Sequence, residues 1–437
     1  MTRRRRARPA GCRRRWRATP SATEPTAGDS AGGVQPETPR VTAPASDARV
    51  RGQPRAAARA TVRAMAEPRQ LVLVGGGHAH VFVLEAWARR PVPGVRLTVV
   101  ADLPVAIYSG LVPACVAGFV EPRAAELDLS ALVAAAGARL VLAHATGLDR
   151  EARAVLLRGG EPVPYDLVSF DVGSTVRGLG LDGVTQHALP TRPIGAFLER
   201  LDALLSGPPP GPRLVVVGAG AAGLELALCA RARGAASVVV IEAGPEPLAS
   251  FPARARRLLQ RSARARAVEL RTGVRVTSVQ AQQVLLEGGE RVPCDAVIWA
   301  AGPAPHDLFE RTGLALHAGY VCVGPTLQSP TDGRVFAAGD CAWLLGHELP
   351  RMGVHAVRQG PVLTRNLMAH LRGQPLAAWR PQADVLRLMN LGDGTALGCK
   401  WGLTVSGRWV ARWKTWLDTS FMRRFTVPPG ASGPAAD

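Results

Sequence analysis

The chain has 437 residues, enough for two or three domains, and its 47% hydrophobic content with 47 glycines predicts a large core with many tight turns. The net charge of +19 is uneven, because residues 1–64 hold 15 arginines against four acidic residues and so carry +11, which leaves +8 for the rest. A charge concentrated in one arm is a weak indication of nucleic-acid binding, and no nucleic-acid partner is expected.

The arm formed by residues 1–64 is dense in Arg, Pro, Ala, Thr and Ser and lacks apolar periodicity. We predict that it is disordered, because it cannot bury enough apolar surface to offset the entropy of ordering. It has no apolar h-region, which argues against a secretory signal peptide, whereas its Arg-rich, acid-poor composition leaves a transit-type targeting peptide open. The interpretation that we favour is that the protein starts at Met65.

The seven cysteines are scattered, with no C-x-x-C pair and no metal-ligand spacing. This pattern predicts free thiols in a reducing compartment and no metal site. No uncharged apolar run reaches the length of about 18 residues that suggests a transmembrane helix. We therefore expect a cytoplasmic protein, with contact to the cytoplasmic face of a membrane left open.

The first predicted elements form a βαβ unit after Arg69. A buried strand over 71–74 is followed by a helix from about 80 to 90 and by a strand over 95–100. The turn between the first strand and the helix has the sequence Gly-Gly-Gly-His-Ala-His, at positions 75–80. A strand, a glycine turn and a helix in this order are typical of a site for a dinucleotide.

Each residue of this turn has an expected task. Gly75 would allow the tight turn, and Gly77 would let the backbone approach a pyrophosphate near the free N–H groups of the helix start. The third glycine of the usual motif is replaced by His80, and the acid expected to bind a ribose is displaced by one position to Asp102. We interpret His78 and His80, which flank Ala79, as helix-start residues with solvent-facing or locally bonded rings and assign them no catalysis.

A second βαβ unit starts after the stiff Gly-Pro-Pro-Pro-Gly-Pro run at 207–212. Gly218, Gly220 and Gly223 complete G-x-G-x-x-G between a strand and a helix, and Glu242 ends the next strand. Every part stands in the required context, so this signal is strong. A carboxylate at this position accepts hydrogen bonds from the ribose hydroxyls and repels a 2′-phosphate, which favours NADH over NADPH.

Three later segments each consist of a buried strand followed by a glycine. They are 165–174, 295–302, which ends at Gly302, and 335–340, which ends at Gly339 and Asp340. We expect a helix from Gly353 to about 371. The fold class is therefore α/β, with two doubly wound dinucleotide-binding (Rossmann-like) domains and a small C-terminal Trp-rich segment.

The C-terminal segment carries Trp409, Trp413, Trp416, Leu417 and Phe421 at three- and four-residue steps. The basic residues around them are Arg412, Lys414, Arg423 and Arg424. A basic amphipathic helix with tryptophans can lie in a membrane interface. The alternative, slightly favoured, is a helix packed on the neighbouring domain or on the second subunit of a homodimer.

With both glycine motifs, the Trp-Ala-Ala-Gly end at 299–302 and Gly339-Asp340, the chain resembles flavoproteins of the FAD-dependent pyridine nucleotide-disulfide oxidoreductase family. These include type II NADH dehydrogenases and sulfide:quinone oxidoreductases. The segments 71–81, 108–110, 327–329 and 357–361 look most like the flavoprotein module often fused ahead of selenide,water dikinase.

The resemblance implies a discontinuous FAD-binding domain over 65–211 and 295–373, an NAD(H)-binding domain over 212–294 and a C-terminal segment over 374–437. It implies that FAD is held by the first glycine turn and Asp102, by the segments around Pro113, Gly302 and Gly339-Asp340, and by the helix start at Gly353. Residues expected near the flavin are Pro113, Cys115 and Gln359. Cys115 is favoured as a small buried hydrophobe over a flavin-facing thiol.

The resemblance also implies the chemistry, because the flavin takes a hydride from NADH at N5 and passes electrons to a small-molecule acceptor. A quinone-like acceptor is suggested by the type II dehydrogenases, although Val354 and Arg358 replace the two glutamines of their quinone-side helix. The alternative is a selenium- or sulfide-linked accessory module with low NADH turnover.

Overall fold

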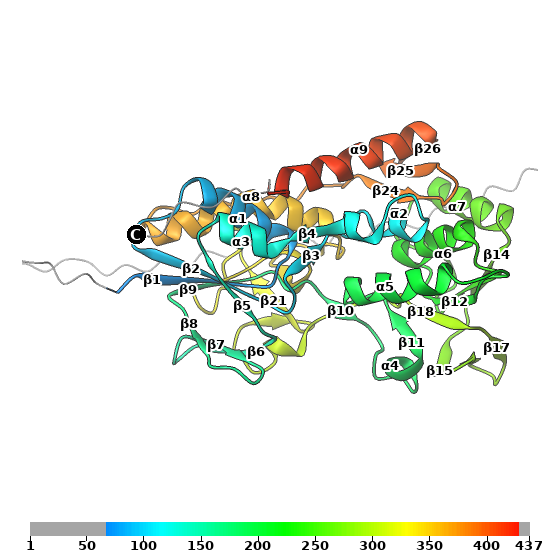
Figure 1. The fold of residues 1–437 in the computed structure, drawn as a ribbon, viewed down its shortest axis with the longest axis horizontal. Helices are drawn as coiled ribbons and strands as arrows, with labels where there is room; N and C mark the ends of the chain where they lie inside the picture. The colour runs from blue at the N-terminus through cyan, green and yellow to red at the C-terminus, as the bar shows by residue number, and fades with distance from the viewer. Residues whose placement is uncertain (1–66, 428–437) are drawn as a thin grey trace, which may run out of the picture. The chain divides into compact units, whose positions relative to one another are not determined.

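A computed structural model describes residues 67–427 and contains two separate five-stranded parallel sheets. In the first, β1 (Arg69–Val74) lies between β2 (Val95–Ala101) and β9 (Leu167–Phe170), with β5 (Arg139–Leu142) and β22 (Val335–Ala337) outside them. All pairs are parallel, so the carboxyl ends of the five strands lie along one edge (Figure 1). The expected arm at 1–64 lies outside the described residues.

Helices cover this sheet and explain its continuous apolar strands. α1 (His78–Arg89) packs against α8 (Gly353–Leu371) and α3 (Leu129–Ala135). The side chains of β1 from Leu71 to Val74 are almost fully buried. A parallel strand covered on both faces needs such an unbroken apolar run, which is the pattern seen in the sequence.

The second sheet has the order β11-β18-β12-β13-β14, and all of its pairs are parallel. Its strands are β11 (Ala188–Pro190), β12 (Arg213–Val217), β13 (Ser237–Glu242), β14 (Val268–Thr272) and β18 (Ala296–Trp299). Its helices are α4 (Val184–His187), α5 (Ile194–Leu205), α6 (Ala221–Arg233) and α7 (Ala253–Ala265).

This topology differs from the expected domain limits at 211/212 and 294/295. β18 pairs with β12, and β11 pairs with β18, although the sequence analysis assigned both strands to the first domain. The physical reason is that a short apolar strand without a glycine motif carries no sign of the sheet that it joins. The strands of the second sheet therefore lie between Ala188 and Trp299.

Smaller elements connect and border the two sheets. The antiparallel strands β10 (Thr175–Val176) and β19 (Pro303–Ala304) form the connection from one sheet to the other. The other short elements are α2 (Val112–Val116), β3 (Val105–Ile107), β4 (Glu126–Asp128), β6 (Ala145–Asp149), β7 (Ala154–Leu157), β8 (Val163–Pro164), β15 (Val276–Gln280), β16 (Gln283–Leu286), β17 (Arg291–Pro293), β20 (Leu316–His317), β21 (Tyr320–Val323), β23 (Ala342–Leu344) and three 3-10 turns, η1 (Pro122–Ala125), η2 (Asp307–Phe309) and η3 (Gly339–Cys341).

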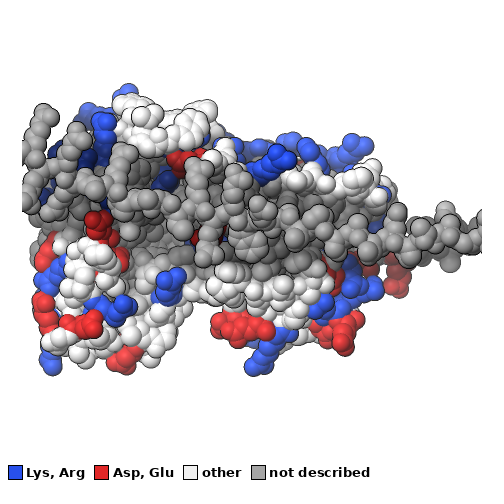
Figure 2. Space-filling model, turned by 180° about the vertical axis from the view of Figure 1, so that it is seen from behind, with Lys and Arg blue, Asp and Glu red and all other residues white. Residues whose placement is uncertain are grey.

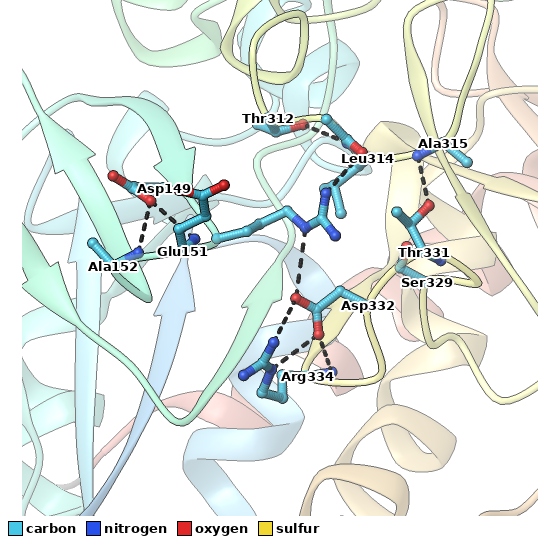
Figure 3. Close-up of polar contacts among 12 residues, drawn as sticks. Asp149, Glu151, Ala152, Thr312, Leu314, Ala315, Ser329, Thr331, Asp332 and Arg334 are labelled. Carbon is cyan, nitrogen blue, oxygen red and sulfur yellow. Dashed lines mark hydrogen bonds and ion pairs between the residues drawn. The ribbon is translucent and has the colours of Figure 1, made fainter.

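A buried ion-pair cluster ties the loop before β22 to the β6–β7 turn (Figure 3). Asp332 accepts hydrogen bonds from the backbone N–H and Nε of Arg334, both at 3.0 Å, and lies 3.6 Å from Nε of Arg150. Burial raises the pKa of Asp332, but the hydrogen bonds and charges of the two arginines outweigh it and hold the pKa below its ordinary value. The cluster anchors the start of β22, whose far end leads to Gly339.

The C-terminal segment consists of an antiparallel sheet and a long helix. The strands are β24 (Arg387–Asn390), β25 (Ala396–Lys400) and β26 (Leu403–Gly407), and α9 (Arg408–Phe425) packs on them. Phe421 stacks on Tyr108 with ring centroids 4.4 Å apart. One face of α9 thus packs on the body of the protein, whereas Trp409 and Trp416 are 55% and 62% exposed.

Lys414 differs from the other basic residues that the sequence analysis named around the aromatic residues of this helix. It is buried, and its Nζ donates to the carbonyl of Gly110 at 2.6 Å and to Asp418 at 2.8 Å. Among residues 67–427, no helix combines the length and the apolar character needed to cross a membrane.

Candidate cofactor-binding site

The first glycine turn is shaped by the neighbouring strand β9. Gly75 has a φ of +96°, and a Cβ there would collide with the carbonyl oxygen of Asp171. Gly77 stands at the N-cap of α1, where a Cβ would collide with the carboxyl group of the same aspartate. Both positions therefore accept only glycine, and the backbone of the turn stays bare.

Asp171 is a central residue of this site, and the sequence analysis included it only within the segment 165–174, without a role. It lies at the carboxyl end of β9 and is 2% exposed, and its Oδ2 accepts hydrogen bonds from the N–H groups of Ala79 at 2.6 Å and His80 at 3.3 Å. Burial raises its pKa to about 7, against the lowering effect of these two hydrogen bonds, and the charge of Asp340 raises it further. An acid that directly follows a buried strand was the available signal.

The two histidines of the turn do not face solvent. His80 is buried, with Nδ1 2.7 Å from the carbonyl of Gly75 and Nε2 2.9 Å from Oγ of Ser169, so its ring is locally bonded as one of the two expected states. His78 is neither solvent-facing nor bonded: its ring packs beside Tyr108, and its Nε2 is buried without a partner. Burial lowers the pKa of both rings to about 4, so both are neutral at pH 7.

The Gly339-Asp340 turn lies directly beside Asp171. A Cβ on Gly339 would press on Oδ1 of Asp171, and the N–H of Gly339 donates to Oε1 of Gln359 at 2.7 Å. The carboxylate of Asp340 pairs with Arg192 at 3.0 Å. The structure therefore brings Asp340 and Gln359 to the first glycine turn, and adds Arg192, which no sequence motif marked.

The start of α8 reaches the same place from another direction. Gly353 is the first residue of the helix, and a Cβ there would lie 3.2 Å from Oγ of Ser109. His355 follows two residues later, 6% exposed, and its Nε2 is buried without a hydrogen-bond partner. The positive end of α8 therefore lies beside the loop at 108–110.

Four other expected residues form no hydrogen bond with these residues of the first turn, of the Gly339-Asp340 turn and of α8. Asp102 is exposed at the end of β2 and pairs with His144 at 3.1 Å. Gly302 lies in the connection between the sheets, where its carbonyl accepts a hydrogen bond from the N–H of Arg177 at 2.8 Å. Pro113 and Cys115 are buried in α2.

Cys115 belongs to the core that α2 shares with α5 and α6. Burial raises the pKa of its thiol to about 11, which is the opposite of what a reactive thiolate needs. The favoured interpretation of Cys115 as a small buried hydrophobe agrees with this position.

The second glycine turn forms a separate cradle on the second sheet. Gly218 has a φ of +105°, and a Cβ on Gly223 would collide with the carbonyl of Gly218, so the turn and α6 pack closely. Gly220, the N-cap of α6, has nothing within 4 Å of a Cβ position. The carboxylate of Glu242 accepts hydrogen bonds from the N–H groups of Ala219 at 2.7 Å and Gly244 at 2.8 Å.

Each glycine turn forms a cradle with the helix start that follows it, the first at 75–80 and the second at 218–223, and both cradles fit a dinucleotide. Each offers a bare backbone turn and a helix start at the carboxyl edge of a parallel sheet, where a pyrophosphate can accept hydrogen bonds from backbone N–H groups. The first also holds the buried, unpartnered Nε2 of His78, a polar atom that a bound group can satisfy. A carboxyl group already occupies its helix start, and the raised pKa of Asp171 limits the charge that a pyrophosphate would meet there.

Comparisons with known proteins agree with this architecture. The pattern of the pyridine nucleotide-disulphide oxidoreductases matches residues 69–360. A demethylphylloquinone reductase of Synechocystis is 27% identical over 292 residues, covering 63% of this chain and 72% of the relative. The ferredoxin–NAD(+) reductase component of a biphenyl dioxygenase system from Paraburkholderia xenovorans is 31% identical over 213 residues, or 45% of this chain and about half (49%) of that protein.

Among solved structures, the sulfide:quinone oxidoreductase of Aquifex aeolicus has a TM-score of 0.66 at 19% identity, covering 83% of this chain and 93% of that one. This likeness establishes the fold, with its two parallel sheets. The match over 69–360 shows that the chain belongs to the pyridine nucleotide-disulphide oxidoreductase family, as an FAD-containing oxidoreductase that uses NAD(P)H.

Proposed function

We propose that the protein oxidises NADH and passes the electrons through FAD to a quinone-like small molecule. The observation that supports NADH as the electron donor is the second glycine turn. Gly220 leaves open space there at the start of α6, and Glu242 lies beside it. An acid at this position favours a ribose with free hydroxyls over a 2′-phosphate, which supports NADH as the donor.

The first cradle is the proposed FAD site. Gly75, Gly77 and the N–H group of His78 would hold the pyrophosphate, because Asp171 already accepts hydrogen bonds from the N–H groups of Ala79 and His80. Asp340 would hold the ribityl chain. The flavin, when bound, supplies the redox chemistry by accepting a hydride at N5 and releasing electrons singly or in pairs. Asp340 is already oriented by Arg192, and the turn before it by Gln359, so this part of the cradle is preorganised.

The protein offers no thiol relay between flavin and acceptor among the residues that the structure describes. The six cysteines between 67 and 427 are all free and buried. A sulfide-linked role would need a flavin-facing thiol, and the high pKa and position of Cys115 argue against it. A direct transfer from flavin to a small molecule is the route that remains supported.

We further propose that the exposed apolar surface of the C-terminal segment contacts a membrane, where quinone-like acceptors dissolve. Its residues are Trp401, Leu403, Val405, Trp409, Trp413 and Trp416. Figure 2 shows Lys and Arg side chains at several places along the upper edge of the molecule, and Arg408 and Arg412, which belong to α9 like the last three tryptophans, are exposed. Tryptophans beside basic residues suit an anionic lipid interface.

The test is a comparison of NADH and NADPH as anaerobic reductants of the purified protein, followed by a screen of acceptors. The proposal predicts that NADH bleaches the flavin absorbance faster than NADPH at equal concentration. It also predicts reoxidation by quinones but not by disulfides. Equal bleaching by both donors would contradict the proposal that Glu242 selects NADH. Reoxidation by disulfides alone would contradict the proposal that the acceptor is quinone-like.

A further inference from the structure

A cavity of about 260 Å³ lies next to the first cradle and has no role in the function described so far. It opens between the first turns of α8 and the segment that leads to β24. Its lining consists of His355, Arg358, Trp379, Arg380, Gln382 and Val385. His355 also lines a smaller cavity with Gly339, Asp340 and Gln359, so the larger cavity shares one residue with the proposed flavin site.

One residue that lines the cavity carries a buried polar atom that lacks a partner. His355 is 6% exposed, and its Nε2 makes no hydrogen bond. Burial lowers the pKa of His355, so its ring is neutral at pH 7 and can exchange one hydrogen bond with a ligand. An unsatisfied buried nitrogen is costly, and a ligand in the cavity would relieve that cost.

The rim of the cavity is positively charged. Arg358 and Arg380 are exposed there, and neither forms an ion pair with any residue from 67 to 427. The cavity also lies at the N-terminal end of α8, whose dipole favours anions. Two guanidinium groups that line one cavity are suited to bind a carboxylate or an enolate oxygen.

The shape of the site limits the ligand further. The volume lies below the range of about 300–1,000 Å³ that is typical for drug-sized ligands, so one or two fused rings would fill it. Trp379, whose ring meets that of His355 edge to face at 6.2 Å, supplies an aromatic wall. A planar ring with an anionic oxygen therefore suits the aromatic wall, the unpartnered nitrogen of His355 and the two arginines of the rim.

We propose that this cavity is the acceptor site and that it selects a small anionic ring compound, such as a hydroxylated quinone, over a neutral quinone. The inference rests on the proposed function, since it names the acceptor class of the same enzyme. The net reaction balances as NADH, one proton and the quinone giving NAD⁺ and the hydroquinone. Arg358 and Arg380 act on the anionic group, and His355 on a ring oxygen.

The test measures binding to the oxidised holoenzyme, without NADH, by calorimetry or by the change in the flavin spectrum. The probes are hydroxynaphthoquinone, an anion at neutral pH, and menadione, a neutral analogue of similar size. We expect the anion to bind at least about tenfold more tightly, and Arg358→Gln and Arg380→Gln each to weaken it by about tenfold, the loss of one charged hydrogen bond. Binding of menadione should change little.

The matched control is Arg365→Gln, an exposed arginine on the same helix that does not line the cavity. It should leave binding of both probes unchanged. Equal affinity for the two probes, or an equal effect of Arg358→Gln and Arg365→Gln, would overturn the proposal. Flavin reduction by NADH in the wild type, recorded separately, tests the proposed function, so the two failures are distinguishable.

Discussion

At the scale of single residues, the ionisation of Asp171 should make the affinity of the proposed site for FAD depend on pH. Its folded-state pKa of about 7 lies above the ordinary value of 3.8, so the carboxyl is protonated at mildly acidic pH and becomes charged as the pH rises. A pyrophosphate bound beside a carboxylate would suffer repulsion. We therefore predict that the affinity of the apoprotein for FAD falls as the pH rises through about 7, by up to about tenfold per pH unit.

Asp171→Asn should abolish most of this slope and bind FAD more tightly than the wild type in alkaline buffer. The measurement is the quenching of FAD fluorescence on reconstitution. Glu225→Gln is the matched control, because burial also raises the pKa of Glu225 to about 7, yet its carboxylate bonds to the N–H of Asn390, outside the cradle. The account of Asp171 fails if the slopes of the wild type and Asp171→Asn coincide.

Glu242 supports a second prediction at this scale. Glu242→Gln should raise the KM for NADH by about tenfold, the equivalent of one hydrogen bond to a charged group, and leave the FAD content unchanged. Steady-state kinetics with a soluble acceptor would measure it. Glu246→Gln, an exposed neighbour that pairs with Arg256, should have little effect, and an unchanged KM in Glu242→Gln would argue against the assigned ribose contact.

Residues differ in how far the sequence revealed them. The glycines and Glu242 stand in a spacing with one physical meaning, whereas Asp171 and Arg192 act through partners that lie far away in the chain. Asp171 bonds to Ala79 and His80, and Arg192 to Asp340. Such pairings depend on how the strands are ordered in the sheet, which local patterns do not contain.

At the scale of elements, α9 is held by a buried charge rather than by its tryptophans. Lys414 lies among Asp418, Glu225 and the carbonyl of Gly110. We predict that Lys414→Met lowers the free energy of unfolding by about 3–5 kcal/mol, because it strands a buried carboxylate. Thermal unfolding would measure this loss, and the double variant with Asp418→Asn should lose less than the sum of the two single variants.

Arg412→Met, at an exposed position of the same helix, should change stability by no more than about 0.5 kcal/mol. Equal losses in the two methionine variants would show that the charge cluster contributes nothing special. The helix itself was predictable from the spacing of its aromatic residues. Which of its faces packs inward was not, because Lys414 carries a charge that a sequence pattern assigns to the surface.

The outward face of α9 leads to a separate prediction. Replacing Trp409 and Trp416 with serine should weaken binding to anionic vesicles by about tenfold or more, which corresponds to about 1.4 kcal/mol. Co-sedimentation with vesicles measures it, and NADH oxidation with a soluble acceptor serves as the folding control. If the serine variant sediments as well as the wild type, these tryptophans do not contact lipid.

At the scale of the whole molecule, the glycine motifs predicted two nucleotide-binding folds, and the two parallel sheets confirm the α/β class. The limits of the folds were less predictable, since β11 and β18 join the second sheet through pairings distant in sequence. Every residue assigned to the two cradles lies between 75 and 359. We therefore predict that a chain lacking residues 1–64 keeps its FAD content, measured by absorbance of the purified protein.

The central claim is that two nucleotide cradles on one chain bring NADH and FAD together. The most direct measurement is anaerobic rapid mixing of the purified protein with NADH while the flavin absorbance is recorded. The account predicts that the protein carries FAD when purified, and that its flavin band bleaches within a single turnover. A protein that stays colourless after reconstitution with FAD, or a flavin band that NADH leaves unchanged, would contradict it.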